Sequence, residues 1–119
     1  MSDKEQDPTG RNQHEPGSKL DAGKPMASLL SHFGLALLEV AKVGTFGAKK
    51  YTFGGWQEVP EGVLRYSDAM WRHLCKEHTE AIDKDSGMLH QAQIAWNALA
   101  RLELMLRASQ KESTDDPQS

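Results

Sequence analysis

Apolar residues recur every three or four positions in three stretches of this sequence, which predicts helices at residues 26–43, 66–83 and 88–107. We expect Gly44 to end the first helix and the turn-forming run 84–87 to end the second. The third stretch is apolar on most of its sides, as in a helix at the centre of a bundle or one shared with a second subunit. No alternation typical of β-strands competes, so the sequence predicts an all-α fold.

The segment between the first two helices is richer in glycine and proline. Residues 45–51 could form a short additional helix, whereas residues 54–62 favour a loop. Trp56 lies in this loop without an apolar neighbour close in sequence. We therefore expect its ring to pack onto the helices or to cover a ligand. Together the predicted helices would form a small bundle of about four helices.

Both ends of the chain are polar. Residues 1–20 and 108–119 contain too few apolar side chains to offset the entropy cost of ordering them, so we expect disordered tails on either side of one domain at residues 21–107. A core this small is marginal when it stands alone. We expect oligomerisation to complete it, as a homodimer or a homotetramer.

Charge and composition exclude several classes of function. A net charge of -3, without a basic stripe, argues against a DNA or RNA polymer as partner. The single cysteine, Cys75, excludes an intramolecular disulfide and a multi-thiolate zinc site. The N-terminal residues lack the apolar core of a signal peptide, and no uninterrupted apolar run reaches about 18 residues. We therefore expect a cytoplasmic protein without a membrane partner.

Three carboxylates follow one another at helical spacing near the end of the second predicted helix. Glu77, Glu80 and Asp83 are separated by steps of three, and His73 lies one step of four before Glu77. Oxygen ligands grouped in this way suit a hard divalent cation such as magnesium. A solvated charged face explains most such spacings, and that alternative stays open.

A second polar stripe runs along the third predicted helix. His90, Gln93, Asn97 and Arg101 follow steps of three, four and four, so they could face the carboxylates across the helical hairpin. The same stripe lies roughly opposite the principal apolar face of that helix. Exposure to solvent is therefore an equally open interpretation.

Several cationic side chains are available for phosphate oxygens. They are Lys24, Lys49, Lys50 and Arg72. The Gly23-Lys24 pair is not a phosphate-binding P-loop, because that motif needs a longer glycine-rich run and a following Ser or Thr.

Six short segments follow, in order, a pattern known from one enzyme family. They are Asp21-x-Gly23-Lys24-Pro25-x-x-Ser28-Leu29-Leu30, Glu39-Val40-Ala41, residues 45–51 (TFGAKKY), Arg72-His73-Leu74, Asp83-x-x-Ser86-Gly87-x-x-His90 and Ala95-x-Asn97-Ala98-Leu99. This pattern resembles the phage-encoded dATP/dGTP diphosphohydrolases, which belong to the wider MazG-like all-α nucleotide pyrophosphatases. The resemblance covers about residues 20–106, and residues 45–51 are its most specific element.

The resemblance implies a MazG-like bundle that hydrolyses a purine deoxynucleoside triphosphate between its α- and β-phosphates. The products would be the monophosphate and pyrophosphate, and the cofactor magnesium (Mg²⁺) or manganese (Mn²⁺). If the protein is phage-encoded, it would act in the host cytoplasm. The implied metal ligands are Glu77, Glu80 and Asp83; the implied catalytic residues are Glu80, His73 and Glu39; the implied substrate-binding residues are Lys24, Lys49, Lys50, Arg72, His90, Asn97 and Trp56.

The sequence departs from the family pattern at a few positions, and one other class of function stays open. Met26, Ala27, Gly55 and Gln93 stand where the family often carries other residues, which concerns the base and sugar contacts more than the reaction. The alternative is a non-catalytic small helical phage protein that binds a host or phage protein.

Overall fold

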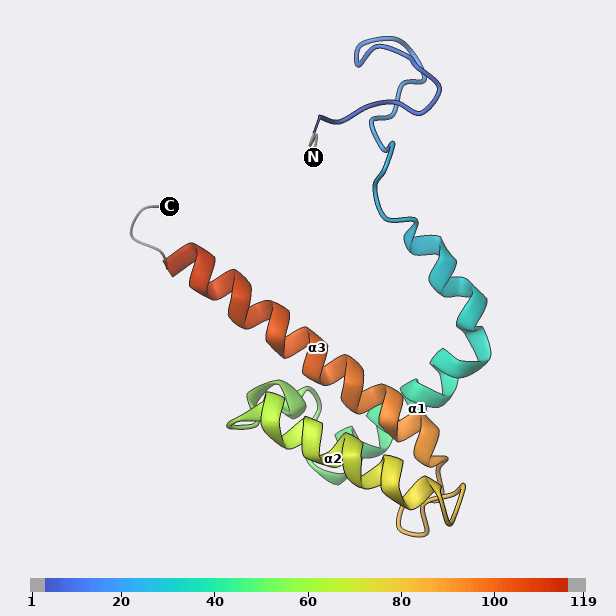
Figure 1. Cartoon of the computed structure of the whole chain (residues 1–119), viewed down its shortest axis with the longest axis vertical. Coiled ribbons are helices and arrows are strands. Elements are labelled where there is room, and N and C mark those ends of the chain that lie inside the picture. The colour runs from blue at the N-terminus through green and yellow to red at the C-terminus, as the bar shows by residue number, and fades with distance from the viewer. Residues whose placement is uncertain (1–3, 116–119) are drawn as a thin grey trace. The chain divides into compact units, whose positions relative to one another are not determined.

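The computed structural model describes residues 4–115 of the chain, and side chains as far as residue 113 (Figure 1). The described part contains helices and no strand, which confirms the all-α class. In order along the chain, the elements are the short 3₁₀ helix η1 (Ala27–Phe33), the helix α1 (Gly34–Lys50), the 3₁₀ turn η2 (Gly55–Glu58), and the helices α2 (Gly62–Glu77) and α3 (His90–Asp115).

The chain forms two compact units, Met1–His32 and Phe33–Ser119. In the described residues of the first unit, the carboxylate of Asp7 accepts hydrogen bonds from the backbone N–H groups of Thr9 and Lys19, both at 2.6 Å, and one from the Thr9 hydroxyl. The Thr9 hydroxyl and the Lys19 amide hold the pKa of Asp7 below its ordinary 3.8. The disorder expected for residues 1–20 and 108–119 stays a prediction.

The second unit is built on a hairpin of α2 and α3, with α1 packed against α3 (Figure 1). Small residues let the helices approach one another. A Cβ atom on Gly44 of α1 would lie 3.0 Å from Nε1 of Trp96 on α3, so only glycine fits this crossing without displacing the ring. Ala92 and Ala100 of α3 are the buried hydrophobic residues of the described chain.

Three aromatic rings fasten the loop before α2 to the hairpin. The ring centroids of Trp56, Tyr66 and Trp96 lie 5.6 to 6.4 Å apart in edge-on arrangements. The Tyr66 hydroxyl also donates a hydrogen bond to the backbone carbonyl of Trp56, at 2.7 Å. Burial raises the pKa of Tyr66 above 10.0, although the charge of Arg65 opposes the shift. Trp56 therefore packs onto α2 and α3, one of the two places expected for it.

The first helix differs from its predicted extent. The prediction that it ends at Gly44 is wrong, because α1 continues through Gly44 and Gly47 to Lys50. The glycine at 44 serves the contact with Trp96 instead of ending the helix. Residues 45–50 accordingly belong to α1, with Tyr51 at its C-terminal cap, rather than forming a separate helix.

The other two helices also end elsewhere than predicted. The second was expected to reach Asp83, but α2 ends at Glu77, where the Thr79 amide bonds to the Lys76 carbonyl at 3.0 Å. The third was expected at residues 88–107, but α3 begins at His90 and continues to Asp115. Glu80 and Asp83 therefore lie in the connection between α2 and α3 and not on a helix.

Large apolar side chains are exposed along α1, α3 and the segment before α1. Leu35 is 86% exposed and Leu38 is 64% exposed, and no residue of α1 is buried. The segment Ala27–Lys50 contains an 18-residue window of mean hydropathy 1.3, and it is long and apolar enough to cross a membrane by length and composition alone. Core helices of soluble proteins pass the same test, so the absence of a membrane partner stays a prediction.

Candidate metal centre at the α2–α3 junction

The connection between α2 and α3 folds back on itself through backbone hydrogen bonds. The Asp83 amide donates to the Met88 carbonyl at 2.8 Å, and the His90 amide donates to the Ala81 carbonyl at 2.9 Å. Gly87 turns the chain between them with a φ of 74°, a backbone conformation that favours glycine. The fold thereby brings Asp83 close to the first residue of α3.

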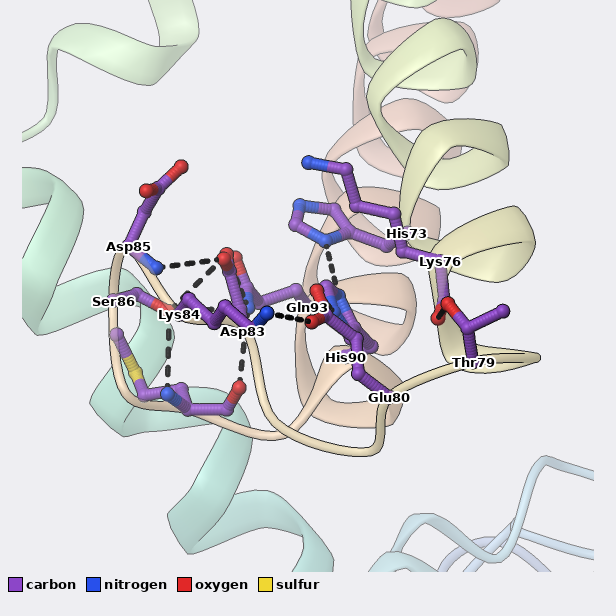
Figure 2. A network of polar contacts seen from close by, with 11 residues as sticks. His73, Lys76, Thr79, Glu80, Asp83, Lys84, Asp85, Ser86, His90 and Gln93 are labelled. Atoms are coloured by element: carbon purple, nitrogen blue, oxygen red, sulfur yellow. Dashed lines mark hydrogen bonds and ion pairs between the residues drawn. The ribbon is translucent and has the colours of Figure 1, made fainter.

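The carboxylate of Asp83 is buried and accepts three hydrogen bonds (Figure 2). Oδ1 accepts from the backbone N–H of Asp85 at 3.0 Å, and Oδ2 accepts from Gln93 Nε2 at 3.1 Å and from the Ser86 hydroxyl at 3.3 Å. Burial by itself raises the pKa of Asp83, but these hydrogen bonds and the nearby His73 outweigh it and hold the pKa below 3.8. Asp83 is therefore an ionised carboxylate at neutral pH.

Two imidazole rings meet beside this carboxylate. Nδ1 of His73, on α2, lies 2.9 Å from Nδ1 of His90, and Nε2 of His90 lies 3.1 Å from Oε1 of Glu80. Figure 2 shows the His73 ring directed at His90, with Glu80 beside it. A carboxylate only accepts hydrogen bonds, so the hydrogen between Glu80 and His90 belongs to Nε2 of His90, and Nδ1 of His90 faces His73.

His73 favours its neutral form. Burial lowers its pKa below the ordinary 6.5, and electrostatic repulsion from His90, Lys76 and Arg72 acts in the same direction. The carboxylate of Asp83 opposes the shift without cancelling it. A neutral imidazole is the form that coordinates a metal ion.

His73, Asp83 and His90 together make a candidate metal-binding cluster, which we call the His–Asp cluster. One ligand atom from each side chain lies within 4.8 Å of the others. Two imidazole nitrogens and one carboxylate are the donor set of many catalytic metal sites that keep positions open for water or substrate. The residues present therefore fit a divalent cation.

The structure separates the three carboxylates that the sequence analysis grouped. Asp83 lies in the His–Asp cluster, whereas Glu80 contacts His90 and has Lys84 3.8 Å away. Glu77 is the last residue of α2. Gln93 and Ser86, which had no assigned role, hold the Asp83 carboxylate, and the turn-forming run 84–87 was the sequence signal for that loop.

The second polar stripe faces inward rather than toward solvent. His90, Gln93 and Asn97 are all buried, which resolves the alternative left open by the sequence. Asn97 donates to the backbone carbonyl of Gln93 at 2.8 Å, so its amide bonds to its own helix. Arg101 Nε donates to the Ser67 hydroxyl at 2.6 Å and ties α3 to α2.

The other predicted site residues have different surroundings. Glu39 forms an ion pair with Lys42 at 2.7 Å, along an open groove on α1 that Lys49 also lines. The ammonium of Lys50 lies 5.3 Å from the centre of the Tyr51 ring. Two further cations complete the set: Lys24 pairs with Glu5 in the first unit, and Arg72 is exposed on α2 beside His73.

The fold and the cluster define a class: a small all-α protein with a candidate metal centre between two antiparallel helices. Residues 14–116 match the family described as dATP/dGTP diphosphohydrolase, N-terminal. The chain belongs to this family, which confirms the resemblance seen in its sequence. No curated protein and no solved structure matches the chain.

Proposed function

We propose that this protein is a metal-dependent hydrolase that converts dATP and dGTP to the monophosphate and pyrophosphate. The observation that carries the proposal is a largely buried His–Asp cluster in a member of a family named for dATP/dGTP diphosphohydrolysis. Burying a carboxylate and an imidazole, as for Asp83 and His90, is costly unless they are paired, and sites of this kind are common where chemistry occurs. The family name implies a nucleotide substrate.

In this proposal, the chain's own residues prepare a site for a cation and a triphosphate. A bound divalent cation would neutralise phosphate charge and supply a water of lowered pKa. Asp83, His73 and His90 are the proposed ligands, and Glu77 and Glu80 lie close along the chain to accept a proton. Arg72, one residue before His73, is the cation best placed in sequence to meet a phosphate oxygen, with Lys49 and Lys50 as further candidates.

We also propose that the active form is a homodimer or a homotetramer in the cytoplasm, in the host's cytoplasm if the protein is phage-encoded. The exposed leucines of α1 and α3 support this assembly, because a partner subunit would remove them from water. Lys49 and Lys50 end α1, so they could contribute to a site shared between subunits.

The direct test is hydrolysis of the four deoxynucleoside triphosphates by the full chain, with and without Mg²⁺ or Mn²⁺. We expect pyrophosphate and monophosphate from dATP and dGTP, and no turnover by Asp83→Asn. Asp85→Asn is the matched control, because the Asp85 side chain is exposed and only its backbone N–H contacts Asp83. Absence of pyrophosphate release from every nucleotide, in protein shown to be folded, would overturn the proposal.

The same exposed apolar residues favour one other function, a non-catalytic interaction protein. In that case α1 and α3 would bind a host or phage protein, and Asp83→Asn would leave the binding unchanged. A biological effect of the protein that does not depend on dNTPs and persists in Asp83→Asn would favour this alternative over the hydrolase.

A further inference from the structure

We infer that the His–Asp cluster selects a first-row transition-metal ion, such as Zn²⁺ or Co²⁺, over Mg²⁺. The inference deepens the proposed function and rests on it for the reaction that the ion would serve. The preference for the ion follows separately from the donor atoms of three side chains: His73, Asp83 and His90.

The first argument is the identity of the donors. Two of the three side chains offer imidazole nitrogen, a ligand that suits zinc, cobalt and other transition metals. Mg²⁺ is a hard cation that prefers carboxylate, water and phosphate oxygens in octahedral geometry. A site built for Mg²⁺ would not need to bury His90 completely, as this fold does.

The second argument is the small number of oxygen lone pairs that remain. An ionised carboxylate offers about four acceptor positions. Three positions on Asp83 are occupied, by the Asp85 amide, the Ser86 hydroxyl and the Gln93 amide. Asp83 therefore has about one acceptor position left for a cation. One carboxylate oxygen is not enough to form an oxygen-only coordination shell within this cluster.

The third argument is the spacing of the two imidazoles. Nδ1 of His73 and Nδ1 of His90 are 2.9 Å apart, a separation that a single shared hydrogen can bridge. Two nitrogens bound to one tetrahedral zinc ion at its usual bond lengths lie about 3.3 Å apart. A transition-metal ion could therefore replace the shared hydrogen with a small rotation of either ring. In a neutral His73 that hydrogen would move to Nε2 by exchange with solvent, which leaves the Nδ1 lone pairs of both rings for the ion.

The fourth argument is the partner of the other His90 nitrogen. Nε2 of His90 lies 3.1 Å from Oε1 of Glu80, while Nδ1 points to His73. Metal-bound histidines nearly always donate their second ring N–H to a carboxylate or a carbonyl, which fixes the ring and makes it a better ligand. Glu80 therefore acts through His90 as a positioning residue rather than as a ligand.

The test is metal binding by the full chain after treatment with a chelator. We expect one equivalent of Co²⁺ to produce visible ligand-field absorption, and Zn²⁺ to displace it. Calorimetric titration should give an affinity for Zn²⁺ more than about 100-fold above that for Mg²⁺. Glu80→Gln should weaken Zn²⁺ binding by about 10- to 100-fold, as for other lost outer partners of a metal-bound histidine.

Matched variants separate this site from adventitious binding. His90→Gln and Asp83→Asn should abolish the Co²⁺ absorption, whereas His78→Gln and Asp85→Asn, which alter exposed side chains of the same region, should leave it unchanged. If His90→Gln fails to fold by circular dichroism, His73→Gln replaces it, because His73 is only half-buried.

The outcomes distinguish the metal preference from the proposed function. Equal Zn²⁺ binding by the wild type and by His73→Gln would overturn the inference. Hydrolysis of dNTPs with Mg²⁺ by a protein that binds no Co²⁺ would also overturn it, but would leave the proposed function intact. Tight Zn²⁺ binding that is lost in the cluster variants, in a protein without dNTP hydrolysis, would support the inference and overturn the proposed function.

Discussion

The α2–α3 junction and the exposed side of α1 show opposite patterns of burial. At the junction, His90 is fully buried and Asp83 is 7% exposed, although both are polar. On α1, Leu35 is 86% exposed and no residue is buried, although much of the helix is apolar. The hydrophobic effect alone would produce the reverse arrangement in a single chain.

This difference indicates which parts of the chain are complete by themselves. Within the described residues, every buried side-chain nitrogen or oxygen has a hydrogen-bond partner, so the junction needs no further polar contact to be stable. The apolar side of α1 has no such completion, because its leucines remain in water. The junction is thus a preorganised site. The apolar side of α1 is a surface that a partner would cover.

The largest effect should come from breaking the junction. His90→Gln removes a proposed ligand, and we expect kcat/KM for dGTP to fall by at least about 100-fold, more than the loss of an outer partner causes. Steady-state pyrophosphate release measures the change, with His78→Gln as the control on an exposed histidine. Full activity of a folded His90→Gln variant would show that the junction is a structural polar cluster and not the catalytic site.

The second largest effect concerns the surface of α1. Leu38→Asp should remove the free energy of burying one leucine, about 1.5 to 3 kcal/mol, from each subunit of a symmetric dimer. The loss from both subunits together is enough to raise the Kd of the dimer by more than about 100-fold. Sedimentation velocity should show monomers at concentrations where the wild type is assembled. Phe53→Ser is the control, because Phe53 is 95% exposed in the turn before η2. A wild type that is monomeric at all concentrations would contradict the expectation.

The sequence was sufficient for the helical class and for the helical hairpin. The spacing of Met70 and Leu74, and later of Ala92 and Leu99, is that of amphipathic helices, and the polar run 84–87 can only be a connection. The sequence also indicated Asp83 and His90 as candidate site residues. Local patterns suffice for such features because they depend on neighbours in the sequence.

The grouping of ligands could not be predicted in the same way. Glu77, Glu80 and Asp83 keep helical spacing beyond the point where α2 ends, so periodicity alone extended the helix through them. The hydrogen bond from the His90 amide to the Ala81 carbonyl closes the connection between α2 and α3, and no helical periodicity reports it. For the same reason, the sequence left open whether His90 faces α2 or solvent, because that depends on where the facing helix lies.

The pH dependence of stability should reveal the junction in the metal-free protein. The pKa of His73 is lowered from 6.5 in the fold, so between 6.5 and its folded value the unfolded chain binds more protons. The free energy of unfolding should therefore fall as the pH decreases through this range. The pKa of Asp83 is lowered from 3.8, so a further loss should follow at more acidic pH.

Urea unfolding at a series of pH values measures this dependence. His73→Gln should remove the component that appears just below pH 6.5, whereas His78→Gln should keep it. If the pH profile of unfolding is the same in His73→Gln as in the wild type, urea unfolding does not disrupt the junction. The transition would then report the loss of apolar contacts between the helices.

The smallest effect compares two glycines of α1 that have different neighbours. Alanine is favoured over glycine within a helix by about 1 kcal/mol. At Gly47, no described atom beyond its chain neighbours and the nearby backbone of α1 lies within 4 Å of the added Cβ, so this gain should appear as increased stability. At Gly44, the Cβ would meet Trp96 at 3.0 Å, and that ring is braced by Trp56 and Tyr66 at centroid distances of 5.7 and 5.6 Å.

Overpacking against a ring that cannot move costs about 1 to 3 kcal/mol, so Gly44→Ala should destabilise the protein by up to about 2 kcal/mol despite its better helix propensity. Urea unfolding of the two variants at one protein concentration gives the comparison. Destabilisation by Gly47→Ala that disappears on dilution would place a second subunit against α1 at Gly47, because only a contact that depends on concentration would meet the new methyl group. Stabilisation by both variants would mean instead that α1 does not approach Trp96 as closely in solution as the crossing at Gly44 requires.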